Sequence, residues 1–542
     1  MVIGSKQGLE YQTGEYLITD DSNNQLNKLV MLFTPTLSSE SFKAWIWKDA
    51  ENRLLLKFSV LAVVISFTWL KIVYPYPNFM PPDSNSYLRA AFSNQFINLW
   101  PIGYSKFVRL VSCFTNSHFV LVSLQYLLLQ ASLLYFLFSV RYWLSPGKWA
   151  FRALFAVSIL NPLLIHIANF VATDSLFTTL SVVWFTQLLW IACRPTKKVI
   201  AWHAVIIVLA FMVRFTALYY PFISIAAILF YPVNRNLKFS GIALILLLIG
   251  LFGGSTAYEY KKRTDTVQYS AFGGWQIGSN ALYAYAHAKP IPVEKVPAKF
   301  RALHAIVNKH MESLKRVPEV IRPDYEVAVY YLWDFKSPLR VYMNQRYPKL
   351  SDDQFFYKWA AFAPLFASYG RFLIKQYPKE YINYYLWPNF LKYYAPPAKF
   401  MSVYNMKNET VEPIVVNWFG LKNNKLHTYF KNREIKVTAP FPVLFATINI
   451  LFALGFLSFV MLGGYKNCTN YCKRILWITL LVWFVNMAFS VLTAPIELRY
   501  QIFPMIFTLA VAWQFMSYII IQTRNESDKK FTLDNSIPKT AI

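Results

Sequence analysis

Long runs of apolar residues recur along this chain, and they constrain its fold more than any other feature. We assign ten runs, at residues 54–73, 117–138, 149–168, 175–193, 199–213, 216–231, 239–257, 439–463, 475–493 and 501–522. A run of about 20 apolar residues has the length of a helix that crosses the hydrocarbon core of a bilayer. Only 15% of the 542 residues are charged, against about 25% in soluble proteins. The sequence therefore predicts an all-α polytopic membrane protein with about ten transmembrane helices. Runs 199–213 and 216–231 are short, so a single interrupted helix is an alternative for them.

Basic residues in the loops predict the orientation of these spans. Lys and Arg follow the second, fourth, sixth and eighth runs, and cytoplasmic loops carry such an excess. The turn at 169–174 contains neither Lys nor Arg. We therefore expect residues 1–53 and the polar tail 523–542 to be cytoplasmic, with the tail disordered. Residues 74–116 and 258–438 are then external, and they divide the membrane core into 54–257 and 439–522.

The two external segments differ in length and composition. In 74–116, apolar residues recur at helical spacing between Ser86 and Cys113, which is typical of helices lying in the membrane interface. The segment 258–438 has the pattern of a mainly helical insertion, with amphipathic stretches at 297–316, 353–376 and 377–394. The net charge of +27 is spread between apolar runs and forms no basic domain, so we expect no nucleic-acid partner.

Five charged residues are predicted to lie at the external ends of the spans. They are Asp83, Asp174, Arg214, Glu497 and Arg499. A charge near the bilayer centre costs roughly 2.5–3.5 kcal/mol or more, so such residues belong where a helix meets water or another charge. Because all five fall on one face of the predicted bundle, they indicate a site.

The two aspartates have a functional and a structural interpretation. Asp83 follows Pro81-Pro82, where a carboxylate can act as the general base that takes a proton from an acceptor. Asp174 can orient an acceptor or coordinate a metal, with Asn169 in the same turn as its support. Both aspartates can instead be helix N-caps. Asp83 and Asp174 together are the candidate ligands for a divalent cation, although no Asp-x-Asp pair is present.

The remaining candidates are substrate-binding residues. Arg214 and Arg499 suit a phosphate, because a guanidinium binds its oxygens in a bidentate way. The alternatives are an Arg214 side chain that snorkels to the interface and a self-contained Glu497–Arg499 ion pair. His166 is a candidate ligand, although a lone membrane histidine is more often a packing residue. Tyr87 lies one turn beyond Asp83 and completes the set.

The order of these motifs resembles the GT-C superfamily of integral-membrane glycosyltransferases, which includes the dolichyl-phosphate-mannose–protein mannosyltransferases. The features that carry the resemblance are an acidic residue in the first external loop (Asp83), an Asn-Pro at 161–162 before an external turn with Asp174, Arg214 followed by Pro221, and Arg499-Tyr500 before the last span. The resemblance covers residues 54–257 and 439–522, and the segment 258–438 resembles the external insertions of uncharacterised bacterial members. The short motifs carry weight through their order and their common face.

This resemblance implies an inverting transfer of a hexose or pentose from a polyprenyl-phosphate-linked sugar donor to a lipid, glycan or protein acceptor. It implies a multi-pass protein of the bacterial inner membrane whose site faces the periplasm. Asp83 would be the base, Asp174 would support the acceptor or a metal, and Arg214 and Arg499 would hold the lipid phosphate. Related transferases often carry Asp-Glu at the first acidic position, whereas this chain has Asp83-Ser84, which leaves the acceptor open.

A transporter or flippase for a lipid-linked saccharide is the alternative function. Transporters place their charges near the bilayer midplane on broken helices, often in two related halves. Here the charges fall at helix ends and no half-to-half repeat is present, which favours the enzyme.

Overall fold

The structure is a computed structural model that describes residues 41–348 and 352–536. Within these residues it is built from helices, with no β-strand beyond isolated bridges, and eight stretches are long and apolar enough to cross a membrane. The helices of these stretches are α3 (Ala50–Val73), α6 (His118–Leu144), α7 (Lys148–Ile159), α8 (Pro162–Ala168), α9 (Thr173–Cys193), α12 (Arg235–Thr264), α21 (Phe441–Met461), α23 (Asn470–Thr493) and α24 (Ile502–Ser536). The expectation of an all-α polytopic membrane protein is confirmed.

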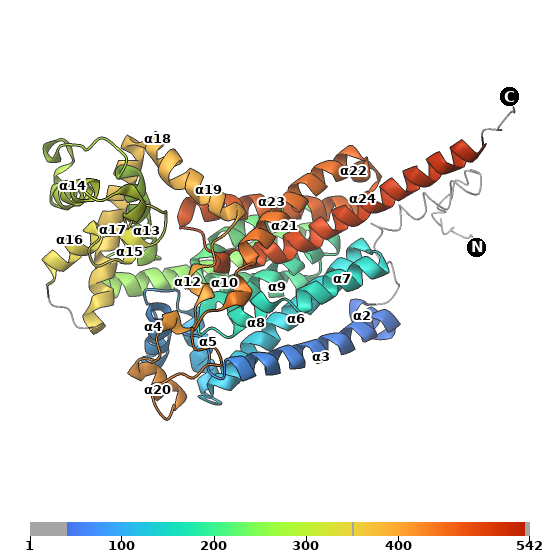
Figure 1. Cartoon of the computed structure of the whole chain (residues 1–542), viewed down its shortest axis with the longest axis horizontal. Helices are drawn as coiled ribbons and strands as arrows, with labels where there is room; N and C mark the ends of the chain where they lie inside the picture. Colours follow the sequence, from blue (N-terminus) through green and yellow to red (C-terminus); the bar gives the residue numbers. More distant parts are fainter. Residues whose placement is uncertain (1–40, 349–351, 537–542) are drawn as a thin grey trace, which may run out of the picture.

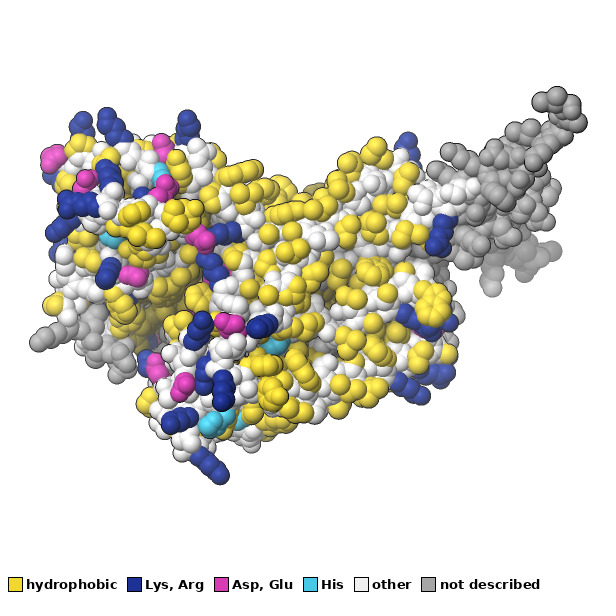
Figure 2. Space-filling view, viewed as in Figure 1, with side chains coloured by type: hydrophobic (Ala, Val, Ile, Leu, Met, Phe, Trp, Pro, Cys, Tyr) yellow, Lys and Arg dark blue, Asp and Glu magenta, His cyan; other side chains and the backbone are white. Residues whose placement is uncertain are grey.

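These helices run roughly alongside one another and form one bundle (Figure 1). Hydrophobic side chains cover its middle, while charged side chains gather towards its two ends (Figure 2). The end that carries α13 to α17 is called the insertion end below. The short helices α2 (Phe42–Lys48) and α22 (Gly464–Asn467) lie at the other end.

The third expected span, 149–168, is interrupted. Helix α7 ends at Ile159, and α8 begins at Pro162 after the cap residue Asn161. The Asn161 side chain accepts a hydrogen bond from the Leu163 amide at 3.0 Å. Proline lacks an amide donor and suits the first position of a helix, so Asn-Pro ends one helix and begins the next.

The expected spans 199–213 and 216–231 form two short helices that fold back on each other. Helix α10 (Lys197–Val213) ends at Arg214, whose backbone is extended, and a 3₁₀ turn η1 (Phe215–Tyr219) leads into α11 (Tyr220–Phe230). His203 of α10 and Ser224 of α11 are hydrogen-bonded at 2.9 Å between Nε2 and Oγ. Because these residues lie ten or eleven positions on either side of Arg214, the two helices are antiparallel. The alternative of one interrupted helix is therefore wrong.

Helix α9 is the centre of the bundle, and almost all of its residues are buried. It packs against α6, α10, α23 and α24. Its first turn, which contains Asp174, is thus enclosed by protein. The position of α9 brings a charged residue into the interior at the insertion end.

The first loop is attached to the α8–α9 turn. It contains α4 (Pro81–Phe92) and α5 (Gly103–Ser112). The Asn78 amide donates to the Asn169 carbonyl at 2.8 Å, and the Val171 amide donates to the Asn78 carbonyl at 3.0 Å. The Ser84 hydroxyl donates to the Val171 carbonyl at 2.8 Å. These bonds fix the start of α4 against the turn that precedes α9.

The segment 258–438 has two parts. The first part has its own hydrophobic core around Trp275 and Trp359 and contains α13 (Ala271–Tyr285), α14 (Arg301–Lys315), α15 (Tyr330–Trp333), α16 (Pro338–Arg346), α17 (Asp352–Gln376), α18 (Pro378–Tyr381), a π-helical turn η5 (Ile382–Leu386) and α19 (Trp387–Tyr394). The second part, residues 396–438, is called the lobe. It contains α20 (Pro413–Phe419) and packs into the core of the bundle and first loop.

The expectation that 523–542 is disordered is wrong for residues 523–536, which continue α24 as far as Ser536. Residues 537–542 lie outside the described residues. No proline or glycine occurs between 523 and 536, and Pro538 follows. An established helix extends by one hydrogen bond per residue, so polar residues without a breaker can prolong it.

Candidate functional site

The five charged residues singled out in the sequence meet at the insertion end as one ion pair and one group of three. In the ion pair, Arg214 Nη1 lies 3.2 Å from Asp174 Oδ1. Their side chains are 14% and 5% exposed. The pair joins the first turn of α9 to the turn between α10 and α11. Because both side chains are buried, removing either charge would leave the other unpaired in the interior, which is costly in stability.

The second group is centred on Arg499, whose side chain is 10% exposed. Its Nη1 lies 3.1 Å from Asp83 Oδ2, and its Nε lies 3.1 Å from Glu497 Oε2. Its Nη2 donates to the Tyr500 hydroxyl at 2.8 Å. All three guanidinium nitrogens are therefore engaged, and two carboxylates share one cation.

Tyr500 connects the two groups. Its ring centre lies 4.7 Å from the guanidinium carbon of Arg214 and 4.8 Å from that of Arg499. Cations near an aromatic face are attracted by its quadrupole. The ring therefore holds both guanidinium groups within one site, although no direct contact between Arg214 and Arg499 is involved.

Neither aspartate is a helix N-cap, so the structural interpretation considered above is wrong for both. The cap of α4 is Met80 and that of α9 is Ala172, while Asp83 and Asp174 lie in the first turns. An anion in the first turn is favoured by the helix dipole. The Pro81-Pro82 start of α4 sets the direction of this turn towards Arg499.

The segment that carries Arg499 is fixed by backbone contacts with the insertion. The Leu498 amide donates to the Pro397 carbonyl at 3.0 Å. The Ile496 amide donates to the Asn389 side chain at 2.9 Å. Residues 498–500 form the short 3₁₀ turn η9 (Leu498–Tyr500) just before α24. The large insertion thus positions the arginine that meets Asp83.

Burial sets the acidity of the two carboxyl groups that share Arg499. Burial raises the pKa of Asp83 above its ordinary value, while the Arg499 guanidinium opposes this shift and the nearby Asp174 adds to it. Burial likewise raises the pKa of Glu497, again opposed by Arg499. A carboxylate with a raised pKa is a stronger base, which is the property that a general base needs.

The carboxylates singled out as ligands for a divalent cation have arginine partners. Asp83 and Asp174 each pair with a different guanidinium. Over the described ranges, no group of three or more His, Cys, Asp or Glu side chains is arranged to hold a metal ion. A cation bound by these two carboxylates would have to replace Arg499 and Arg214 as their partners.

The other three candidate residues, Asn169, His166 and Tyr87, are not part of the two ion-paired groups and contact Lys71, Tyr74 and Tyr104 respectively. Asn169 accepts a hydrogen bond from Lys71 at 2.8 Å between Nζ and Oδ1. The buried His166 packs edge-on against the Tyr74 ring, and its Nε2 has no hydrogen-bond partner among the described residues. Tyr87 is buried against Tyr104. Its phenol lies near Asp83, and burial together with that negative charge raises its pKa.

Sequence reasoning did not single out Lys71, which hydrogen-bonds Asn169, or the position of Tyr500 between two arginines. Lys71 lies in the last turn of α3 and has no carboxylate within 4.0 Å in the described part of the chain. A lysine near the end of an apolar run resembles an ordinary snorkelling residue, so the sequence carried little signal for it. Tyr500 was part of the Arg-Tyr motif, but its position between two arginines depends on tertiary structure.

Comparison with known proteins finds no matching family model, no matching curated protein and no matching solved structure.

Proposed function

We propose that this chain is an integral-membrane glycosyltransferase. It transfers a sugar from a polyprenyl-phosphate donor to a lipid, glycan or protein acceptor at the insertion end, which loop charge assigns to the outside of the membrane. The observation that carries the proposal is the Asp83–Arg499–Glu497 group with the Asp174–Arg214 pair beside it. Acids and guanidinium groups at a membrane-level site supply what the transfer needs, a base for the acceptor and cations for a phosphate.

The acceptor hydroxyl or amine attacks the anomeric carbon of the donor sugar. A bond forms from the acceptor oxygen or nitrogen to that carbon, while the bond from the carbon to the phosphate oxygen breaks. Asp83 takes the acceptor proton, and the polyprenyl phosphate leaves with the electron pair of the broken bond. A single displacement of this kind inverts the anomeric configuration.

Arg499 links donor binding to activation of the base. In the structure its nitrogens are shared between two carboxylates and a phenol. A donor phosphate that takes the Nη1 position displaces Asp83 from its cation. The freed carboxylate loses the opposing effect of Arg499 on its pKa, so it becomes a stronger base when the donor is present.

The test is donor turnover by the purified chain with Asp83→Asn. The substrates are polyprenyl-phosphate-linked hexoses and pentoses, and the readout is released polyprenyl phosphate. The matched control is Asp265→Asn, because the Asp265 side chain is 90% exposed and its residue has a positive φ that Asn tolerates. We expect loss of turnover in Asp83→Asn and full turnover in the control.

Two outcomes contradict the proposal. Turnover that is unchanged in Asp83→Asn removes Asp83 as the base. If the wild-type chain releases no polyprenyl phosphate with any donor, but moves a lipid-linked saccharide across a liposome membrane, the chain is a transporter.

A further inference from the structure

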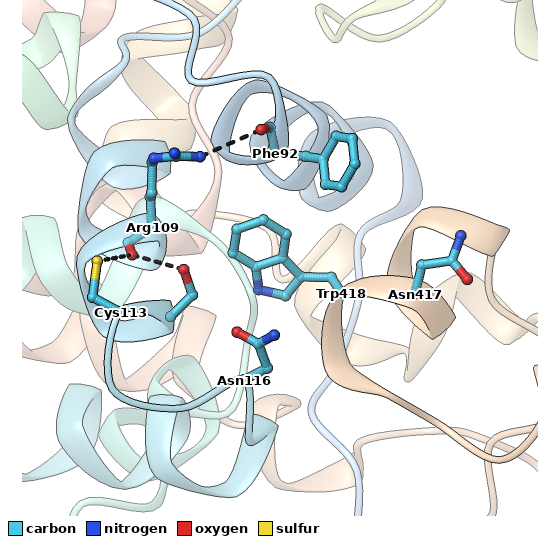
Figure 3. Close-up of a pocket in the computed structure, with 7 residues that line it drawn as sticks. Phe92, Arg109, Cys113, Asn116, Asn417 and Trp418 are labelled. Atoms are coloured by element: carbon cyan, nitrogen blue, oxygen red, sulfur yellow. Dashed lines mark hydrogen bonds between the residues drawn. The ribbon is translucent and has the colours of Figure 1, made fainter.

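A pocket lies at the insertion end, away from the paired acids and arginines. It has a volume of about 360 Å³ and is lined by residues of α4, α5, the turn after α5 and α20, namely Phe92, Arg109, Ser112, Cys113, Asn116, Asn417 and Trp418. Figure 3 shows Trp418 between Phe92, Arg109 and Asn116. Asp83 and Phe92 occupy opposite ends of α4, nine residues apart, or about 13 Å at the rise of an α-helix. The pocket is thus separate from the site described above.

Arg109 is the charged residue that lines this pocket, and only one of its three guanidinium nitrogens donates a hydrogen bond to the described residues. Its Nη1 donates to the carbonyls of Ala91 and Phe92 at 2.9 and 3.3 Å, which satisfies the end of α4. Within the described part of the chain, its Nε and Nη2 have no hydrogen-bond partner, and no carboxylate lies within 4.0 Å of it. These two nitrogens form the edge of arginine that binds two oxygens of one phosphate.

The neighbouring cation differs from Arg109 in this respect. Arg89 of α4 lies 2.7 Å from Glu412, the residue that precedes α20. This ion pair joins α4 to the start of α20, two elements that line the pocket, and it neutralises Glu412. Arg109, in contrast, lines the pocket as a cation with no carboxylate partner among residues 41–348 and 352–536.

The pocket lies at the level where the helices leave the membrane. Asn116 precedes the start of α6 by two residues, and the Tyr429 amide of the lobe donates to the carbonyl of Val73, the last residue of α3. Tyr429 and Phe430 of the lobe are exposed there. Exposed aromatic side chains at span ends are typical of the headgroup region.

The rim of the pocket suits the chains of a lipid. Phe92 lines the pocket and is more than half exposed, as are Leu110 and Phe114, which follow the lining residues Arg109 and Cys113 in the chain. The lobe that forms one wall is basic, with seven Lys and Arg (residues 399, 407, 422, 425, 431, 433 and 436) against three Glu (409, 412 and 434). Anionic lipid surfaces attract such clusters.

We propose that this pocket binds the phosphate headgroup of an anionic membrane lipid. Arg109 holds the phosphate through Nε and Nη2, the amides of Asn116 and Asn417 hydrogen-bond the polar headgroup atoms, and Trp418 packs against the headgroup. The lipid chains lie along Phe92, Leu110 and Phe114. This site is independent of the proposed transferase activity.

The test is native mass spectrometry of the purified full chain titrated with phosphatidylglycerol, phosphatidylcholine or polyprenyl phosphate. The main variant is Asn417→Asp, which adds a negative charge at an exposed position in the pocket. Its control is Asn423→Asp, which adds the same charge to an exposed position of the lobe outside the pocket. A third variant, Arg109→Gln, removes the phosphate-binding group.

We expect one anionic lipid to bind the wild-type chain at a lower concentration than phosphatidylcholine. Affinity falls about tenfold or more in Asn417→Asp and Arg109→Gln, as charge-assisted hydrogen bonds are lost or opposed, and stays unchanged in Asn423→Asp. Preference between phosphatidylglycerol and polyprenyl phosphate identifies the source of the headgroup. Equal loss in Asn417→Asp and Asn423→Asp overturns the site, because it shows general attraction to the lobe. Displacement of the lipid by a soluble oligosaccharide assigns the pocket to sugars and also overturns it.

Discussion

The substitution Arg499→Gln is expected to destabilise the folded chain, because Arg499 has several partners in the site. Gln keeps a polar side chain but has no charge, and it cannot supply three guanidinium nitrogens. The substitution removes the contacts of Arg499 with Asp83 and Glu497, both at 3.1 Å, and with the Tyr500 hydroxyl at 2.8 Å. Two carboxylates, 14% and 5% exposed, then share the site without their common cation.

The expected loss in the free energy of unfolding depends on the two carboxylates, Asp83 and Glu497, that Arg499→Gln leaves without their cation. Removing one partner of a buried ion pair destabilises a protein by about 3–5 kcal/mol. Protonation of the carboxylates limits this cost, so we expect about 3 kcal/mol near neutral pH rather than twice the single-pair value. A loss of that size lowers the melting temperature by roughly 6 °C or more.

The pH dependence has a defined sign. Asp83 and Glu497 already have pKa values raised above their ordinary values of 3.8 and 4.5 in the folded chain. A group whose folded pKa is raised contributes stability that is present below its unfolded pKa and is lost as pH rises through the folded pKa. Stability contributed by these groups therefore falls as pH increases above about 4. Without Arg499 the pKa values rise further, so the deficit of Arg499→Gln grows with pH.

The assay is thermal unfolding of the purified chain in detergent between pH 4.5 and pH 8. The control is Lys315→Gln, because the Lys315–Glu312 pair on α14 is solvent-exposed and worth about 0–1 kcal/mol. The reasoning is refuted if Arg499→Gln melts within 2 °C of the control at pH 8, where ~1 kcal/mol corresponds to about that shift. A deficit that shrinks as pH rises refutes the assigned pKa directions.

Three further predictions concern packing, accessibility and the other ion pair. Gly274→Ala destabilises the insertion by about 1–3 kcal/mol, since the new Cβ would lie 2.2 Å from the Ala363 carbonyl oxygen, whereas Gly273→Ala, with nothing within 4 Å, is neutral or stabilising; thermal unfolding of both variants checks this. A membrane-impermeant maleimide labels the folded chain at the exposed Cys113 ahead of the three buried cysteines, and does so from outside in intact cells; labelling only after lysis contradicts the orientation. Asp174→Ala leaves its arginine partner uncompensated and costs about 3–5 kcal/mol, and a melting temperature equal to that of wild type would show that the pair is dispensable.

The sequence predicted the helices because apolar length is a local property. Eight of the ten expected spans correspond to stretches long enough to cross a membrane, and the other two correspond to α10 and α11. The interruption at Asn161-Pro162 and the return of the chain at Arg214 were harder to predict. A hydrophobic pattern states that residues are buried, but it does not give the direction of the next helix.

In the tail, by contrast, the sequence prediction ended a helix too early, since α24 continues to Ser536. Polarity after residue 522 favoured disorder, yet nothing in 523–536 breaks a helix. Composition describes whether a segment can bury surface, whereas helix continuation depends on the backbone bonds that precede it.

The charged residues of the site were visible in the sequence because charges are costly beside a bilayer and stand out in an apolar chain. The sequence alone placed Asp83, Asp174, Arg214, Glu497 and Arg499 at one end of the bundle. Only the tertiary structure decided their partners, since residues up to 416 positions apart meet in the pair of Asp83 and Arg499. Pairing depends on which helix ends are neighbours and on how the insertion holds η9, and those are properties of packing rather than of any local segment. The same reason explains why the pocket at Arg109 and Trp418, built from the first loop and the lobe, appears only in the folded chain.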